Sequence, residues 1–195
     1  MSCCLTYLRG DIEYMDIGAA MKAVGPERSA YALRYRQEKD RRLSLAAALL
    51  LQQGLREVFG IPSLPPLCHT ERGKPFIAGR PDVHFSLSHC AKLVACVVSR
   101  HPVGIDVESI APYDGELVAV TMNADEQRRI ALSARPDSAF TRLWTMKESL
   151  LKLTGEGLRD DMRGVLDEAD AYSFSCQEHS EEGYVLTICK KKRDW

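Results

Sequence analysis

The stretch FTRLWTMKESLLKLTGEGL, residues 140–158, lacks proline and has few β-branched residues, which predicts a helix. At about 100° per residue, Leu143, Met146, Leu150 and Leu153 gather on one arc, which we expect to face the core. The roughly opposite arc combines an aromatic ring, a carboxylate and two amines: Trp144, Lys147, Glu148 and Lys152. Such an arc fits an anion-binding site, and it also fits an ordinary exposed helix face.

A second acidic group lies upstream in VGIDVES. Alternate residues of a strand share a face, so Asp106 and Glu108 point to the same side, roughly 6.6 Å apart. Two carboxylates at this distance repel by about 2–3 kcal/mol at an effective dielectric of about 20. A hard cation relieves that repulsion, and Mg²⁺ commonly combines one or two carboxylates with waters and substrate phosphates. The alternative is a solvated strand face with two ordinary acids.

Two further segments carry groups suited to phosphate. FSLSHC places Ser88 and His89 at the end of a predicted strand, and RGKPFI places Lys74 between Gly73 and Pro75. Glycine lets a ligand approach the backbone closely, while lysine supplies a point charge. Each segment also fits a purely structural strand end or turn.

These groups need a scaffold of helices and strands, and the hydrophobic pattern supplies one. An alanine- and leucine-rich run predicts a helix from about Arg41 to Phe59, with Arg36 and Arg42 on or near its start. KLVACVVS and VGIDVES, separated by RHP, predict an antiparallel hairpin, and strands are also expected near residues 76–77, at 164–166 and in the last 25 residues. Helices and strands alternate in blocks, which predicts the α+β class.

Composition limits the classes of partner. The 195 residues are 45% hydrophobic with a net charge of −1, which fits a globular protein and gives no sign of a nucleic-acid or membrane binder. The first residues lack the pattern of a signal peptide, and no apolar run approaches the ~18 residues of a membrane span. Seven cysteines without a CxxC pair favour reduced thiols, so we expect a cytoplasmic protein.

The segments GRPDVHFSLSHC, GIDVE at 104–108 and LWTMKESLLKLTGEGL at 143–158, with the Gly-Lys-Pro turn, together resemble the motifs of the Sfp-like 4'-phosphopantetheinyl transferases. The family's helix motif, W-S/T-x-K-E-S/A-x-x-K, is matched at every fixed position: Trp144, Thr145, Lys147, Glu148, Ser149 and Lys152. The blocks follow the family's order from about residue 73 to 158. Residues 1–35 and 160–195 match only in general character.

The resemblance implies a fold and an activity. Two lobes of similar topology, residues 1–100 and 101–195, are expected to be related by a pseudo-twofold axis with the active site between them. The family transfers 4'-phosphopantetheine from coenzyme A to a serine of an apo acyl or peptidyl carrier protein, with Mg²⁺, and adenosine 3',5'-bisphosphate leaves. A monomer is expected, with a basic or apolar rim for the acidic helices of a carrier.

The resemblance also implies roles, residue by residue. Asp106, Glu108 and Glu148 become Mg²⁺ ligands, while Lys147 and Lys152 stand beside the pyrophosphate and the attacking serine. For the coenzyme, the resemblance places Ser88 and His89 at the phosphates and the turn of Gly73, Lys74 and Pro75 along the adenosine. Arg42 and Arg36 match the family's group for the 3'-phosphate less closely.

The sequence leaves several alternatives open. Glu148 is a metal ligand, a base for the serine proton, or both. Another Mg²⁺-dependent phosphotransferase would also use Asp106 and Glu108, and a coenzyme A-binding module without turnover would keep the same cleft. The pathway of the carrier and any preference for acylated coenzyme A are not fixed by these residues.

Overall fold

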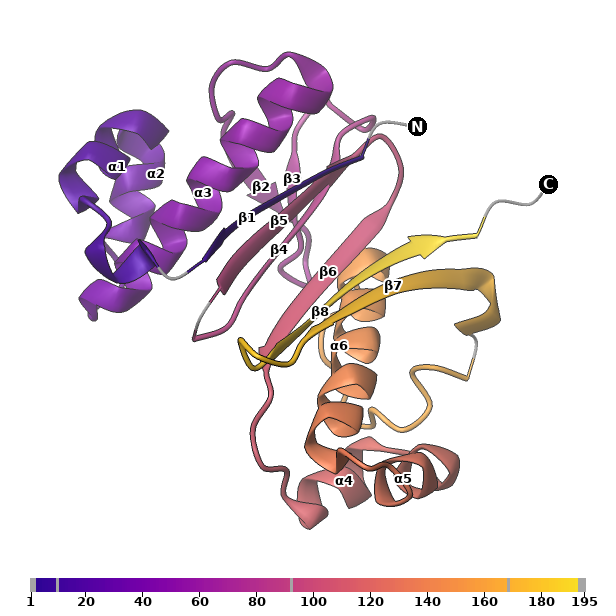
Figure 1. Ribbon diagram of the computed structural model, residues 1–195. Coiled ribbons are helices and arrows are strands. Elements are labelled where there is room, and N and C mark those ends of the chain that lie inside the picture. The colour runs from indigo at the N-terminus through magenta and orange to yellow at the C-terminus, as the bar shows by residue number, and fades with distance from the viewer. Residues whose placement is uncertain (1–2, 10, 92, 168, 193–195) are drawn as a thin grey trace.

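The structure is a computed structural model that describes residues 3–9, 11–91, 93–167 and 169–192 (Figure 1). It is of the α+β class, as the sequence predicts. The first half of the chain contains these elements in order: β1 (Cys3–Arg9), the 3₁₀ turn η1 (Asp11–Tyr14), α1 (Ile17–Val24), α2 (Pro26–Ala32), α3 (Glu38–Phe59), β2 (Leu67–His69), β3 (Pro75–Ile77), β4 (His84–His89) and β5 (Leu93–Ser99). The predicted short strand near residues 76–77 is thus confirmed as β3.

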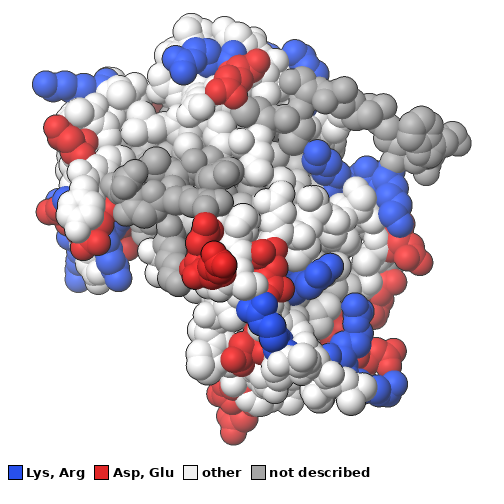
Figure 2. Space-filling view, in the orientation of Figure 1, with Lys and Arg blue, Asp and Glu red and all other residues white. Residues whose placement is uncertain are grey.

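The second half begins with a strand and ends with a hairpin. Its elements are β6 (Val103–Ser109), α4 (Gly115–Thr121), α5 (Ala124–Ala131), α6 (Pro136–Thr154), the 3₁₀ turn η2 (Ala169–Ala171), β7 (Tyr172–His179) and β8 (Tyr184–Lys191). No helix within the described ranges is long and apolar enough to cross a bilayer. On the face shown in Figure 2, basic and acidic side chains are interspersed.

Each half forms an antiparallel three-stranded sheet, and the two sheets have the same strand order. In both, the last strand lies in the centre, flanked by the first and the middle one: β1-β5-β4 and β6-β8-β7. One long helix covers each sheet, α3 on β1 and β5, and α6 on β6 and β8 (Figure 1). The two halves therefore share a plan of three strands and one crossing helix.

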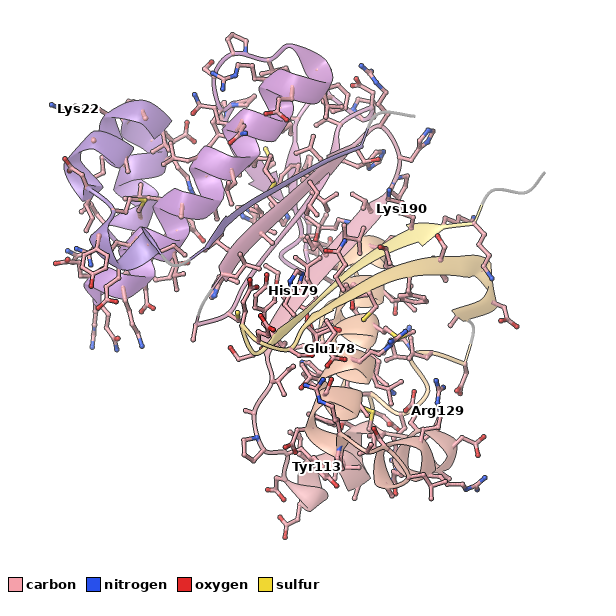
Figure 3. All side chains as sticks on the ribbon, viewed as in Figure 1. Lys22, Tyr113, Arg129, Glu178, His179 and Lys190 are labelled. Carbon is pink, nitrogen blue, oxygen red and sulfur yellow. The ribbon has the colours of Figure 1, made fainter. Side chains whose placement is uncertain are left out.

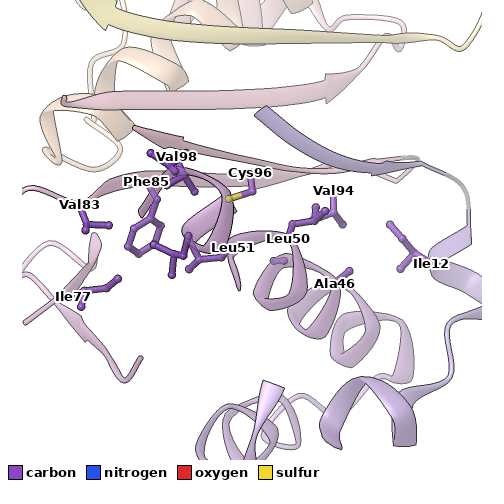
Figure 4. Packing of buried hydrophobic residues seen from close by; sticks show 13 residues of the cluster. Ile12, Ala46, Leu50, Leu51, Ile77, Val83, Phe85, Val94, Cys96 and Val98 are labelled. Atoms are coloured by element: carbon purple, nitrogen blue, oxygen red, sulfur yellow. The ribbon is translucent and has the colours of Figure 1, made fainter. Parts of the chain in front are cut away.

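The core is divided between these layers. Beneath α3, Leu50 and Leu51 pack against Phe85, Val94 and Val98 of the first sheet (Figure 4). A second apolar cluster joins the two sheets to each other, with residues from β5, β6 and β8. Burial on both sides of the central strands explains their near-continuous apolar character.

Helix α6, which carries the motif, has clear end signals. Pro136 occupies its first turn, where the missing N–H costs no hydrogen bond, and Gly155 ends it in the left-handed conformation at φ 78°. The helix thus ends before the predicted Leu158. Thr145 also bonds across to Thr187 of β8, with 2.8 Å between the two hydroxyl oxygens.

A close contact brings α6 against β6. At Gly104, a Cβ atom would lie 1.9 Å from the carbonyl oxygen of Ser149 and 2.7 Å from the amide nitrogen of Leu153. Only glycine permits this approach of helix backbone to strand backbone. The absence of a side chain at residue 104 therefore sets how near α6 lies to Asp106.

Two strand predictions are wrong. β5 and β6 do not form the expected hairpin, because β5 pairs with β1 and β4 whereas β6 pairs with β8. The short connection after Ser99 crosses from one sheet to the other. The sequence does not distinguish such a crossover from a hairpin turn of similar length. The expected strand at residues 164–166 is a turn region.

Gly104→Ala tests the close contact. The new methyl group would overlap helix backbone, which cannot rotate away as a side chain does, so we expect a loss of at least about 3 kcal/mol in the free energy of unfolding. Urea denaturation followed by circular dichroism measures it. Gly115→Ala is the matched control, since nothing lies within 4 Å of a Cβ there. Equal stability of the two variants would contradict the close packing.

Candidate active site

The centre of the site is a buried carboxylate held between the two sheets. Asp106 on β6 is 2% exposed, and its Oδ1 accepts hydrogen bonds from the hydroxyl of Ser88 at 2.8 Å and from the ammonium of Lys152 at 2.6 Å. Lys152 also donates to the Ser88 oxygen at 2.9 Å. Three predicted site residues, from β4, β6 and α6, therefore meet in one hydrogen-bonded triangle.

Two further carboxylates, those of Glu108 and Glu148, lie near this triangle. Burial raises the pKa of Glu108 to about 7, and the negative charge of Asp106 adds to the rise. Burial and the charge of Asp106 likewise raise the pKa of Glu148 above its ordinary value, while Lys152 opposes the rise. One ammonium thus faces three acidic groups, which leaves the site short of positive charge.

The unpaired oxygens indicate where a cation fits. Oδ2 of Asp106 and Oε1 of Glu148 are buried without a hydrogen-bond partner. Buried carboxylate oxygens normally have partners, so such orphans need an explanation, and hard cations prefer oxygen ligands of this kind. In the described part of the chain, no group of three or more acidic, histidine or cysteine side chains is arranged to hold a metal ion by itself. An ion here would share two or three carboxylates with water or substrate oxygens, which is the habit of Mg²⁺.

An aromatic stack supports Glu108. Trp144 lies close to the Glu108 carboxylate, where it lowers the pKa against the larger effect of burial. Trp144 stacks on Phe140 with ring centres 6.3 Å apart, and Phe140 packs on Tyr113, which is labelled near α4 in Figure 3. The sequence placed Trp144 on the same arc as Glu148 and Lys152, but it did not indicate the proximity of Trp144 to Glu108.

A cavity of about 330 Å³ opens beside the carboxylates and is mostly apolar. Glu148 and Lys152 line it from α6, and the predicted Gly73–Pro75 turn lines it from the other half of the chain. The turn is tied to the end of α6, because Lys74 donates to the carbonyl of Leu153 at 2.7 Å and Arg72 donates to that of Glu156 at 3.2 Å. The cavity is therefore built from both halves.

The remaining predicted cationic groups lie at the edge. The ring of His89 ends β4, and partial burial with the nearby charge of Lys152 lowers its pKa, so it is neutral at pH 7. Arg42 pairs with Glu38 at 2.6 Å and its Nε is buried without a partner. Arg36 is exposed between α2 and α3. Within the described ranges, neither arginine forms an ion pair with Asp106, Glu108 or Glu148, whereas the charge of Asp106 acts on His89.

Lys147 does not lie in this site, which argues against its predicted position beside the pyrophosphate and the attacking serine. Its ammonium is fully buried and donates to the Glu126 carboxylate at 2.8 Å and to the carbonyls of Met162 at 2.7 Å and Thr121 at 3.1 Å. The carbonyl of Arg163 is a fourth acceptor at 3.2 Å, so all three ammonium protons are engaged. The wheel angle explains the difference: at about 100° per residue, Lys147 lies roughly 140° from Lys152. It faces α4, α5 and the segment after α6.

Several contributing residues were missed in the sequence. Glu126 is the third residue of an N-capping box begun by Asn123, and it also holds the buried ammonium of Lys147, a role that no local pattern indicates. Gly104 and Ser86 belong to the quoted motifs, but neither carries a reactive group. Their roles in packing become visible only when the two sheets are assembled.

A larger cavity, of about 550 Å³, lies away from the motifs. It is formed by α1, α2 and residues 63–69, and Lys22 of its rim is labelled in Figure 3. None of the predicted site residues lines it. We therefore base the functional argument on the smaller cavity, which contains Glu148, Lys152 and Lys74.

Comparisons with known proteins cover both halves. Residues 13–101 match the N-terminal part of 4'-phosphopantetheinyl transferases, and residues 102–195 match the 4'-phosphopantetheinyl transferase superfamily. A 4'-phosphopantetheinyl transferase of Bacillus pumilus is 36% identical over 182 residues, which cover 85% of this chain and 78% of the relative. The 4'-phosphopantetheinyl transferase Sfp of Bacillus subtilis strain 168 is 28% identical over 191 residues, covering 90% and 85% respectively.

The buried Lys147–Glu126 pair predicts a stability effect. Removing one partner leaves a buried charge uncompensated, so Lys147→Met and Glu126→Gln should each lower the free energy of unfolding by about 3–5 kcal/mol. The double variant should lose clearly less than the sum. Urea denaturation of the four proteins measures this cycle. A Lys147→Met protein as stable as the unmodified chain would show that the lysine is not a structural anchor.

The raised pKa of Glu108 predicts a pH dependence in the absence of metal. Between about pH 4.5 and 7 the folded protein keeps a proton on Glu108 that the unfolded chain has lost, so stability falls as the pH rises through this window. The melting temperature of Glu108→Gln should fall less over this range than that of the unmodified chain. Because the lowered pKa of His89 acts in the opposite direction, the difference between the two proteins is the quantity to read. Glu181→Gln, in an exposed turn, should keep the unmodified slope.

Proposed function

Because this chain belongs to the 4'-phosphopantetheinyl transferase superfamily, as an enzyme of the Sfp-like type, we propose that it transfers 4'-phosphopantetheine from coenzyme A to a carrier protein. The acceptor is a serine of an apo acyl or peptidyl carrier protein. The observation that carries this proposal is the pair of orphaned oxygens on Asp106 and Glu148 beside Lys152, together with the cavity that Glu148 and Lys152 line.

The reaction forms one bond and breaks one. The serine oxygen bonds to the phosphorus that carries the pantetheine arm, and the bond from that phosphorus to the bridging oxygen of the pyrophosphate breaks. The bridging oxygen leaves on adenosine 3',5'-bisphosphate. The serine proton passes to Glu148, directly or through one water, and burial, which raises the pKa of this carboxyl, makes its ionised form a stronger proton acceptor.

The acidic residues suit a resident Mg²⁺. Asp106, Glu148 and Glu108 would hold the ion, which when bound supplies positive charge against the oxygens of the pyrophosphate. Lys152 is 31% exposed at its side chain and lines the cavity, so its remaining ammonium proton is available to the leaving phosphate. Positioning and charge stabilisation are sufficient for this chemistry, without a covalent enzyme intermediate.

The coenzyme has a natural orientation in this arrangement. The apolar cavity beside the turn of Gly73, Lys74 and Pro75 suits the adenosine portion. His89, neutral at the end of β4, offers hydrogen bonds to the phosphates. Arg42 and Arg36 are the candidates for the 3'-phosphate, and Arg42 would exchange its contact with Glu38 for that group.

We also propose that residues 1–100 and 101–195 are two lobes related by a pseudo-twofold axis. The shared strand order of the two sheets and the single covering helix in each support this division. Both halves contribute to the cavity, so a single chain contains a complete site, which favours a monomer. The near-zero net charge gives no support for nucleic-acid or membrane partners, and the seven cysteines without a CxxC pair agree with a cytoplasmic location.

The decisive experiment uses the purified chain with coenzyme A, Mg²⁺ and an apo carrier protein, followed by mass spectrometry of the carrier. We expect a gain equal to one phosphopantetheinyl group. Asp106→Asn keeps the size of the side chain but removes its charge, so its rate should fall by at least about 100-fold. Glu181→Gln, on the surface, should react normally.

The other outcomes identify the competing functions. A carrier of unchanged mass, with coenzyme A retained by the protein, would refute transfer and indicate a binding module. A phosphoryl or nucleotidyl mass gain on another acceptor would indicate a different Mg²⁺-dependent transferase.

A further inference from the structure

The two sheets meet along β4 and β6 through side chains. Ser86 accepts a hydrogen bond from the N–H of Ile105 at 3.1 Å, and Ser88 accepts one from the N–H of Val107 at 3.3 Å. Both serines are buried. A step of two residues along β4 corresponds to a step of two residues in the same direction along β6, so the two strands run parallel. The serine hydroxyls stand where carbonyl oxygens would accept in a continuous sheet.

The hydroxyl of Ser88 is fully committed. A hydroxyl has one proton to donate and two lone pairs to accept with. Ser88 donates its proton to Oδ1 of Asp106 at 2.8 Å, and accepts from Val107 at 3.3 Å and from Lys152 at 2.9 Å. No donor or acceptor position remains for a coenzyme phosphate without breaking one of these bonds.

The bonds of Ser88 determine which oxygen of Asp106 is available. Oδ1 is occupied by the hydroxyl of Ser88 and the ammonium of Lys152, while Oδ2 is buried and has no partner. The serine is itself fixed by the backbone of Val107, the residue next to Asp106. The Ser88 hydroxyl therefore fixes the rotation of the Asp106 carboxylate relative to the backbone of β6.

We propose that Ser88 is a positioning residue: it holds Oδ1 of Asp106 so that Oδ2 is presented to the divalent cation, and it does not bind the coenzyme. This inference rests on the metal site in the proposed function. It replaces the expectation that Ser88 meets the phosphates, which came from the family resemblance, with a role derived from its hydrogen bonds. His89, the next residue, keeps its proposed contact with phosphate.

The chain contains a matched comparison for Ser88. Ser86 lies two residues earlier on the same face of β4 and accepts a β6 N–H in the same way. The residue that corresponds to Asp106 at that level is Gly104, which has no side chain. Ser86→Ala therefore removes the same kind of contact between the sheets but leaves the carboxylate untouched.

The test measures metal binding without coenzyme or carrier, using Mn²⁺ as the probe and the loss of its free-ion electron paramagnetic resonance signal as the readout. We expect Ser88→Ala to weaken Mn²⁺ binding by about 10–100-fold, the usual effect of removing a group that orients a metal ligand. Ser86→Ala should bind Mn²⁺ as the unmodified chain does, and Ser88→Thr, which keeps the hydroxyl, should restore most of the affinity. Thermal melts of both alanine variants show whether their folds are equally affected.

Kinetics provide a second readout. With Ser88→Ala the half-saturating Mg²⁺ concentration should rise, while the KM for coenzyme A at saturating Mg²⁺ stays within about twofold of its original value. Unchanged Mn²⁺ binding by Ser88→Ala, equal loss in Ser86→Ala, or a higher KM for coenzyme A at saturating Mg²⁺ would overturn the inference. Failure of the unmodified chain to bind Mn²⁺ would instead refute the metal part of the proposed function, and this inference with it.

Discussion

The site depends on one buried charge, the carboxylate of Asp106 between the two sheets. A carboxylate that is 2% exposed is tolerated only if hydrogen bonds or opposite charge compensate it. The compensation comes from both directions, a hydroxyl from β4 and an ammonium from α6. Each partner requires its own structural condition: β4 must lie beside β6, and α6 must lie against Gly104. The packing of the two halves and the geometry of the site therefore depend on each other, because the contacts that join the sheets also orient Asp106.

The compensation is incomplete, and the deficit is what makes the site functional. Glu108 and Glu148 add negative charge that Lys152 alone does not balance, and both have raised pKa values as a result of burial and of the charge on Asp106. A protein selected only for stability would not keep three acids with two orphaned oxygens in one place. Perturbed acids that line a cavity are typical of active sites. In the proposed function, a divalent cation held by the acids would remove this imbalance, and Lys152 would remain available to the pyrophosphate.

The sequence predicted the segments of the site better than the contacts among them. Alternation in VGIDVES was sufficient to place Asp106 and Glu108 on one side of a strand, and the motif placed Glu148 and Lys152 on one helix. The α+β class followed from the order of helical and extended patterns. The strand partners could not be predicted in this way, because residues 93–109 have the same local pattern whether the connection is a hairpin or a crossover between sheets. The role of Ser88 was also hidden, since it depends on β4 lying beside β6, and no local pattern encodes that neighbour.

The two lysines of the helix motif show how one short segment serves two purposes. Glu148 and Lys152 are four residues apart, so they lie about 40° from each other on the helix and both line the cavity. Lys147 is five residues from Lys152, about 140° away, and its ammonium is enclosed by Glu126 and backbone carbonyls. A residue type that suits phosphate is used here as a buried anchor, which fixes the rotation of the helix about its own axis. That rotation decides whether Glu148 faces Asp106, so the motif needs a lysine on the hidden side as much as on the reactive side.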